Sequence, residues 1–510
     1  MLTRTNQGRT LAVATLAILA TGCAVGPNFE RPQVPAAERY VPRSVQSGDA
    51  PSITYGAAIA ADWYTLFRSD ALNALVHEAL TNNPDLDAAR HGLVAAQADL
   101  RAVAGGALPQ VDANAGATRS RYNGSLLLEP ANALTAVGNT YSMGATLSYP
   151  LDLFGGIRRG IESQAAVTDN VRHQALNTYI TLVNQVVVTA FDYARVDAQI
   201  RVTQALIGDL RDQLELTARL EEAGKIAHSD TLLAQTQSES TAATLPGLQR
   251  QRAAFSNALA RLTGKTPAEF AAPSVTLEDF SLPPSLPVSL PSILVRQRPD
   301  VLAAEDQLHQ ASAEVGVATA ARLPALTLSG QFSQQANKLG DLSGSAANVW
   351  SFGLDLAAPI LHGGTLSARQ KAAEARYAQA AALYRSTVTG AFVEVGDSLQ
   401  ALEMDSASFA AYRRALDSAR ASRELAAAQF RAGTVTQLQT LIVEQQYQTA
   451  ALAEVQARAQ RFADAASLIH ALGGGWWNAP QDPAQLAAAN TRSSIAIPQA
   501  SAMSEEHSHE

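Results

Sequence analysis

The chain has 510 residues, of which 16% are charged and 6% aromatic, and its formal net charge is −8. This acidic balance, without basic clusters, argues against a nucleic-acid-binding protein. The single cysteine, Cys23, excludes a disulfide within the chain. Beyond the N-terminal region no run of 18 apolar residues occurs, so the sequence predicts no membrane-spanning helix.

Residues 1–22 are typical of an export signal. Arg4 and Arg9 precede a short apolar core at residues 11–20, and small residues stand just before Cys23. A segment of this order is removed from the mature protein. It resembles the bacterial lipoprotein box, in which the cysteine is lipidated and becomes the new N-terminus, although Ala20 stands where leucine is commonest. Ala24, rather than aspartate, favours onward transport to the outer membrane. The alternative is an ordinary signal peptide with a chance cysteine.

Residues 23–61 are rich in proline, glycine, serine and alanine, which predicts an extended, lipid-anchored tether. Helical periodicity begins near Asp62, is interrupted at Pro84 and continues to about Ala104. Gly105 and Gly106 then end the helix.

Four segments alternate strictly between apolar and polar residues, which predicts strands with one apolar and one polar face. They lie at residues 111–118, 141–149, 326–332 and 350–357. Strands of about ten residues can span a membrane, and aromatic residues such as Trp350 suit its interface. A closed barrel needs about eight strands. Several chains must therefore contribute strands, or the sheet is small; a soluble two-sheet sandwich is the alternative.

Two proline-free stretches, residues 157–222 and 365–431, predict helices of roughly 100 Å each. Apolar residues at a spacing of seven run along the first from Tyr179 to Leu214, which predicts supercoiling against another helix. The matching row in the second helix is broken at Arg423, where looser packing is expected.

Each long helix is followed by a glycine, Gly224 or Gly433, which predicts a C-cap and a sharp reversal. Return helices are predicted over residues 229–262 and 436–472. Pro246 should break the first of these, whereas the second contains no proline. Each long helix and its return helix therefore form a hairpin.

The chain contains two copies of one unit. Asn83-Pro84-Asp85-Leu86 returns 215 residues later as Arg298-Pro299-Asp300-Val301, and the strand, glycine and helix landmarks follow in the same order. Such a long repeat indicates a duplicated domain. We assign the copies to residues 62–266 and 293–475, with a proline-rich linker at 267–292. Residues 476–510 are predicted to be a disordered tail.

These features together resemble the TolC superfamily of outer-membrane efflux proteins, and most closely the lipoproteins of the OprM/NodT type. The resemblance covers residues 17 to about 475. It is carried by the start Cys23-Ala24-Val25-Gly26-Pro27-Asn28-Phe29-Glu30-Arg31-Pro32, by both Pro-Asp helix starts, and by the strand-to-helix elbow Tyr149-Pro150-Leu151-Asp152-Leu153-Phe154-Gly155-Gly156.

The resemblance implies a TolC-like α+β fold, in which each duplicated unit has two strands and long antiparallel helical hairpins. It implies a homotrimer that forms a 12-stranded outer-membrane β-barrel and an α-helical periplasmic tunnel. The implied function is the passive exit duct of a tripartite efflux pump for small molecules such as drugs or toxic compounds. The implied partners are a periplasmic membrane-fusion adaptor, an inner-membrane pump of the RND type, and outer-membrane lipid through Cys23. No cofactor is expected.

The resemblance also implies site residues. Adaptor contacts are expected at the hairpin tips, namely Gly224, Lys225, Ile226, Gly433, Thr434 and Val435. Lys225 departs from the usual apolar residue. The periplasmic gate candidates are Asp230, Gln439 and Ile442. Because Ile442 stands where the family often has an aspartate, a polar and apolar constriction is expected instead of an acidic one.

Two other functions stay open on the sequence. One is a TolC-like duct for protein secretion, and the other is a lipid-anchored coiled-coil tether without a pore, which would have no use for amphipathic strands. The sequence contains no Walker loop, Gly-x-Ser-x-Gly or His-Glu-x-x-His motif, so no enzyme is expected. His507 and His509 offer weak metal ligands, but a solvated tail is the favoured interpretation.

Overall fold

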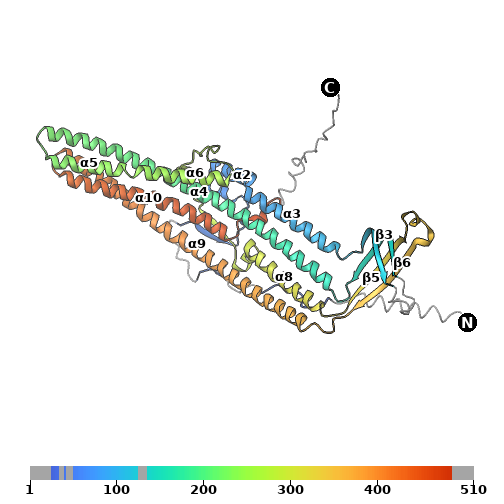
Figure 1. Ribbon diagram of the computed structural model, residues 1–510. Helices are drawn as coiled ribbons and strands as arrows, with labels where there is room; N and C mark the ends of the chain where they lie inside the picture. The colour runs from blue at the N-terminus through green and yellow to red at the C-terminus, as the bar shows by residue number, and fades with distance from the viewer. Residues whose placement is uncertain (1–23, 34–38, 42–49, 124–134, 485–510) are drawn as a thin grey trace, which may run out of the picture. The chain divides into compact units, whose positions relative to one another are not determined.

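The computed structural model describes residues 24–33, 39–41, 50–123 and 135–484 (Figure 1). Cys23, the signal segment and the tail histidines lie outside these residues. The chain divides into two compact units, and each unit takes segments from both sequence copies. The first unit draws on Met1–Pro32, Ala95–Asn170 and Ala303–Arg385. The second draws on Gln33–Val94, Val171–Leu302 and Ser386–Glu510.

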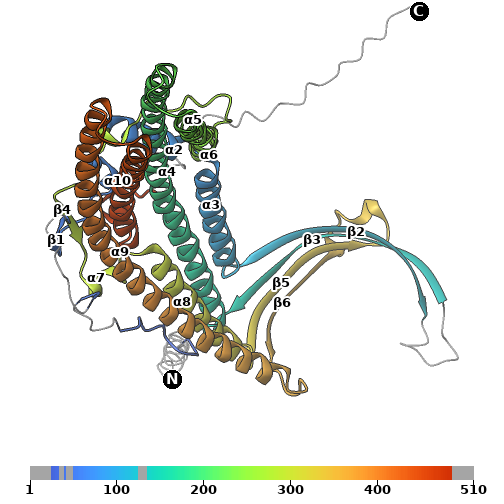
Figure 2. The same ribbon diagram turned by 90° about the vertical axis from the view of Figure 1, so that its left-hand side faces the viewer.

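The first unit holds a four-stranded antiparallel sheet in the order β2-β3-β5-β6 (Figure 2). Its strands confirm all four predicted segments, and each strand is longer than predicted: β2 (Gln110–Asn123), β3 (Thr135–Leu151), β5 (Ala325–Ala336) and β6 (Asn348–Ala357). The two copies meet at the β3–β5 pair, where Ala145 opposes Phe332. Strands β2 and β6 are the two edges of this sheet.

One face of the sheet leaves large apolar side chains uncovered within the chain. Along β6, every second residue from Trp350 to Leu356 is apolar and exposed, and Trp350 is 73% exposed. Val111, on β2, is also exposed. A contiguous apolar surface of this kind indicates contact with a membrane or with another chain.

The two long helices have the predicted lengths. Helices α4 (Gly156–Glu222) and α9 (Thr365–Arg431) each contain 67 residues. Val186 and Val395, one from each row of seven-residue spacing, are fully buried. No helix among the described residues is long and apolar enough to cross a membrane.

The return helices differ between the copies as predicted. The first is split into α5 (His228–Ala242) and α6 (Leu245–Leu262), with Pro246 in the first turn of α6. The second, α10 (Gln437–Ala471), is continuous. Proline lacks a backbone N–H and starts a helix well but does not continue one. In both figures the second-unit parts of α4, α5, α9 and α10 lie side by side.

Shorter helices complete both copies. In each copy a helix that begins with proline, α3 (Pro84–Gly105) or α8 (Pro299–Ala320), precedes the first strand. The core of the second unit includes Phe191, whose ring lies 4.9 Å from that of Phe67 and 4.7 Å from that of Phe280. The remaining short elements are η1 (Trp63–Phe67), α2 (Asp70–Asn82), η4 (Leu277–Asp279), α7 (Pro291–Leu294), η5 (Leu339–Asp341), η6 (Ser345–Ala347) and η7 (Trp476–Asn478).

The duplication repeats a specific contact. Asn83 Nδ2 donates to the carbonyl oxygen of Leu262 at 2.9 Å, at the end of α6. The corresponding residue of the second copy, Arg298, donates through Nη1 to the carbonyl oxygen of Ala471 at 2.8 Å, at the end of α10. In each copy, the side chain of the residue before the Pro-Asp motif thus donates a hydrogen bond to a backbone carbonyl group at the end of the return helix, which has no partner within the helix.

Glycine at position 264 is required by a close approach as well as by its backbone. Gly264 has φ +72°, and a Cβ there would lie under 3.0 Å from the Asn82 carbonyl oxygen. Gly224, with φ +66°, has open space instead. We therefore expect Gly224→Ala to lower stability by about 1–2 kcal/mol through backbone strain alone. Gly264→Ala should add overpacking of about 1–3 kcal/mol. Thermal midpoints of both variants in detergent test this, and equal shifts would contradict it.

The described residues at the start of the segment predicted as a tether make specific contacts with the rest of the chain. The Val25 N–H donates to the Phe154 carbonyl oxygen at 3.0 Å, and the Phe29 ring stacks on His309 with centroids 4.3 Å apart. Further on, β1 (Ser52–Tyr55) pairs in parallel with β4 (Ser285–Val288). These strands lie in the segments predicted as the tether and the linker, and the two-stranded sheet that they form was not predicted.

The predicted tail begins too early. Residues 476–484 are folded in the second unit, where Trp476 Nε1 donates to the Gln297 carbonyl oxygen at 2.7 Å. Asn478 Nδ2 donates to the Ile59 carbonyl oxygen at 2.6 Å, and Arg172 pairs with Asp482. The expectation of disorder is therefore wrong for these residues. They lack periodicity because side-chain contacts to other segments, and not a regular helix, hold them in place.

Candidate functional site

Both hairpin tips are built by glycine in the left-handed conformation. At the first tip the Lys225 N–H donates to the Leu220 carbonyl oxygen at 2.9 Å, and the Gly224 N–H donates to that of Glu221. At the second, the Thr434 N–H donates to the Gln429 carbonyl oxygen, and Gly433 has φ +73°. This is the Schellman arrangement, which satisfies the last carbonyl groups of a helix. The predicted glycine caps are confirmed.

The tips present a mixed surface. Lys225 and Thr434 are exposed, whereas Ile226 and Val435 are half-buried. Within about two turns of the tips, α5 and α10 also leave large apolar side chains exposed, namely Leu232, Leu233, Leu438 and Ile442. Exposed apolar groups rimmed by polar ones are typical of a protein-binding surface.

The predicted gate residues occupy different environments. The Asp230 carboxylate accepts from the Ala227 N–H at 3.4 Å and thereby caps α5. Gln439 is exposed on the first turn of α10, where its backbone N–H donates to Thr436 Oγ1. Ile442 is 49% exposed on the same helix. Among the described residues, no group of three or more histidine, cysteine, aspartate or glutamate side chains is placed to hold a metal ion.

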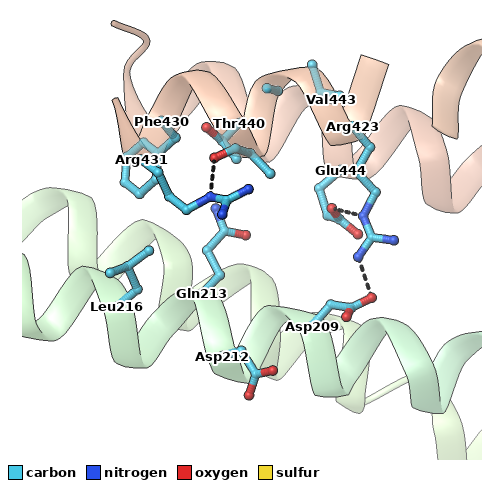
Figure 3. A pocket seen from close by; sticks show the side chains of 12 residues that line it. Asp209, Asp212, Gln213, Leu216, Arg423, Phe430, Arg431, Thr440, Val443 and Glu444 are labelled. Carbon is cyan, nitrogen blue, oxygen red and sulfur yellow. Dashed lines mark hydrogen bonds and ion pairs between the residues drawn. The ribbon is translucent and has the colours of Figure 1, made fainter. Parts of the chain in front are cut away.

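Arg423 of α9 forms ion pairs with residues of two other helices, α4 and α10 (Figure 3). Its Nε donates to Glu444 of α10 at 2.8 Å, and its Nη2 pairs with Asp209 of α4. Its guanidinium also lies over the Tyr447 ring, 4.6 Å from the centroid. The looser packing expected at this break in the apolar row agrees with a cavity that Arg423 lines. A charged node, named here the Arg423 node (Asp209, Arg423 and Glu444), replaces the apolar contact.

The Arg423 node is electrostatically constrained. The Glu444 side chain is only 8% exposed, and burial raises the pKa of its carboxyl although Arg423 opposes this. Burial lowers the pKa of Arg423, but the two carboxylates outweigh it, so the pKa is raised and the guanidinium stays charged. A cavity of about 250 Å³ adjoins the node and is lined in addition by Gln213, Leu216 and Thr440.

A second carboxyl group is buried between α9 and α10. Asp464 is only 6% exposed and accepts from Gln460 Nε2 at 2.9 Å. Burial is the main cause that raises the pKa of Asp464 to about 7, and the neighbouring Asp405 adds to it. A second carboxylate nearby disfavours the charged form of Asp464, because two like charges repel each other.

We expect Asp464 to make the protein less stable as pH rises. Between the ordinary aspartate pKa of 3.8 and about 7, the folded protein holds a proton that the unfolded chain has lost. Stability therefore falls through this window and levels off above it. Asp464→Asn should flatten the slope and raise the thermal midpoint at pH 8. Asp417→Asn, at an exposed position on α9, is the matched control. An unchanged slope in Asp464→Asn would contradict the assignment.

Comparison with known proteins decides the family. The sequence matches the family described as outer membrane efflux protein over residues 75–265 and 290–474. The chain belongs to this family. This outer membrane efflux protein is 29% identical over 498 residues to the antibiotic efflux pump outer membrane protein ArpC of Pseudomonas putida, covering 96% of this chain and 99% of ArpC. It is 27% identical to the cation efflux system protein CusC of Escherichia coli, covering 90% and 97%.

The fold agrees with solved structures of such proteins. The outer-membrane channel OprN superposes with a TM-score of 0.81 at 28% identity, covering 89% of this chain and all of OprN. A CusC structure superposes with a TM-score of 0.76 at 25% identity, covering 88% and 100%. The expected TolC-like fold is confirmed. This outer membrane efflux protein therefore acts in the outer membrane as an efflux channel, and its family is one of transport proteins.

Proposed function

We propose that the protein is the exit duct of a tripartite efflux pump and works as a homotrimer. The carrying observation is the four-stranded sheet, which has an exposed apolar face and two edges, β2 and β6. Four strands cannot close by themselves, and unpaired strand edges are strongly disfavoured in lipid. Three chains complete a twelve-stranded barrel when β2 of one chain pairs with β6 of the next. The long hairpins of the three copies then form the wall of the periplasmic duct.

Transport through this duct is passive, and the driving force comes from the partners. A channel only lets its solute equilibrate, so directed efflux requires an energised pump in the inner membrane, which we assign to the RND type. A periplasmic adaptor joins the two. The relatives are named for antibiotics, toluene and cations, which are chemically unlike solutes. This range supports a wide duct whose substrates are selected upstream; we assign small molecules such as drugs or toxic compounds to this chain.

The adaptor binds at the hairpin tips in this proposal. The support is the repeated Gly-capped turn and the exposed apolar residues beside each tip. Residues 224–226 and 433–435 make the contact, and the residue after the glycine is the charged Lys225 at the first tip but the uncharged Thr434 at the second. The two tips therefore present different surfaces to one adaptor.

Closure of the duct near the tips rests, we infer, on the Arg423 node, together with the exposed side chains of Gln439 and Ile442. The node links the α9–α10 hairpin to α4 of the other hairpin. While the Arg423 node is intact, it holds the two hairpins of one chain together at this level. Asp230, which caps α5, supports the first tip and is a weaker gate candidate.

Lipid attachment at Cys23 adds a second anchor. The described chain begins one residue later, at Ala24, and is held against the first unit from Val25 onward. We expect Cys23→Ala to weaken membrane attachment without preventing insertion of the sheet.

The function is tested by single-channel conductance of the purified protein in planar bilayers, with its mass in detergent measured alongside. A trimer with a small, mostly closed conductance is the expected result. A monomer without conductance would overturn the duct and leave the lipid-anchored tether as the better explanation.

A further inference from the structure

An apolar pocket lies in the first unit at the elbow between β3 and α4. Its volume is about 300 Å³, and its lining comes from both sequence copies, with Leu151, Leu153 and Phe154 facing Val317 and Leu323. This volume is at the lower end of pockets that hold small ligands. Leu153 and Val317 remain more than a third exposed. Filling such a pocket with an apolar group is favourable, because apolar surface is removed from water.

The polar groups at this elbow are already satisfied. The Asp152 carboxylate accepts from the Ile157 N–H at 3.0 Å and the Arg158 N–H at 2.9 Å, so it caps α4. The charge of Asp152 is thus held by the N-terminus of α4. The pocket therefore offers mainly apolar contacts to an occupant.

The first described residues of the chain, Ala24 and Val25, lie beside this pocket. Ala24 packs on Gly155, where a Cβ would lie under 3.0 Å from Ala24. Gly155 is flanked by two pocket-lining residues, Phe154 and Gly156. The Val25 N–H donates to the Phe154 carbonyl oxygen at 3.0 Å. Cys23 directly precedes Ala24 in the sequence.

The position of this segment is fixed by three further contacts. Arg159, whose side chain is 5% exposed, donates through Nε to the Val25 carbonyl oxygen at 3.2 Å and through Nη2 to Asn28 Oδ1 at 2.6 Å. Gly26, with φ +90°, packs so closely against the Gly316 backbone that a Cβ at position 26 would lie under 3.0 Å from it. The segment is thus clamped where it passes the elbow.

We propose that this pocket holds an acyl chain carried by Cys23, so that the lipid anchor is docked on the protein before it enters the bilayer. The proposal rests on lipidation of Cys23, which belongs to the proposed function. A tethered acyl chain reaches the pocket at a high effective concentration, which favours it over a free lipid.

The test uses the full chain, produced in cells fed a fatty acid that carries a photoreactive diazirine. After illumination, mass spectrometry should find the peptide that begins at Cys23 joined through its acyl chain to the peptide that contains Phe154. Ala321→Phe, at an exposed position that lines the pocket, should lower this crosslink at least fivefold. Val111→Phe, on the exposed face of β2, is the matched control and should not change it.

The outcomes separate the two proposals. If the intact mass shows an acylated Cys23 but the acyl chain forms no crosslink at the elbow, the docking proposal is wrong and the lipid anchor is retained. This result is expected if another chain of the trimer covers the pocket. Elbow crosslinks that persist in Cys23→Ala would assign the pocket to free lipid and also overturn it. If the mass of the protein shows no acyl group on Cys23, both the lipid anchor and its docking are wrong. The channel function is tested independently by the conductance measurement.

Discussion

Replacing Arg298 with alanine is expected to lower the free energy of unfolding by about 2–4 kcal/mol, because a buried guanidinium loses its charge-assisted hydrogen bonds to two partly exposed carboxylates. The Arg298 side chain is only 9% exposed. It pairs with Asp300 and with Glu394, each at 2.7 Å, and also donates to the end of α10. Alanine would leave two carboxylates without their counter-charge and a helix-end carbonyl without its donor.

The duplication provides a matched control for this prediction. Asn83 makes the corresponding contact in the first copy and is equally buried, but it carries no charge. Asn83→Ala should therefore lower the free energy of unfolding by only about 1–3 kcal/mol, the effect of leaving a neutral buried group without its hydrogen bond. Denaturant midpoints in detergent compare the two variants. If Arg298→Ala destabilises no more than Asn83→Ala, the ion pairs contribute nothing beyond the shared contact.

Local periodicity explains why much of the fold could be predicted from sequence. Alternation over eight or more residues specifies a strand and its two faces, and a long proline-free stretch specifies a helix. Helix α9 begins and ends at the predicted residues, Thr365 and Arg431. Gly224 and Gly433 mark their turns because few other residues adopt positive φ without strain.

Contacts between distant segments were beyond such analysis. Strand β1 has four residues, too few for a visible period, and its partner β4 lies more than 200 residues away and contains Pro287. The folded residues after Trp476 are held by hydrogen bonds to Gln297 and Ile59, which no local pattern encodes. In both cases the sequence identifies an irregular segment but not the surface that binds it.

The candidate site shows the same division. The sequence reveals Arg423 as an interruption of an apolar row, and an arginine in such a row is a signal that carboxylates are near. It does not reveal that Asp209 and Glu444 supply them from two other helices. The tip residues could be located because helix ends have local signatures. Their binding roles depend on a second protein and therefore remain proposals.

Arg423→Ala is expected to raise the open fraction of the channel about tenfold, which corresponds to a shift of about 1.4 kcal/mol within the usual range of conformational coupling. In the wild-type protein, the ion pair of Arg423 with Asp209 joins α9 to α4 of the other hairpin, and the pair with Glu444 joins α9 to α10. The proposed closed state would depend on the first of these pairs. Alanine removes both and leaves the buried Glu444 carboxylate without its counter-charge. Single-channel recordings at constant salt measure the open fraction directly.

Arg431→Ala is the matched control for this variant. Arg431 is on the same helix, lines the same cavity and carries the same charge, but its Nε donates only within α9, to the Ala427 carbonyl oxygen at 3.2 Å. It should leave the open fraction unchanged. Asp209→Ala should open the channel like Arg423→Ala, and the double variant should add little, since both changes break one link. If Arg431→Ala opens the channel equally, the effect is one of cavity charge and the Arg423 node does not hold the hairpins closed.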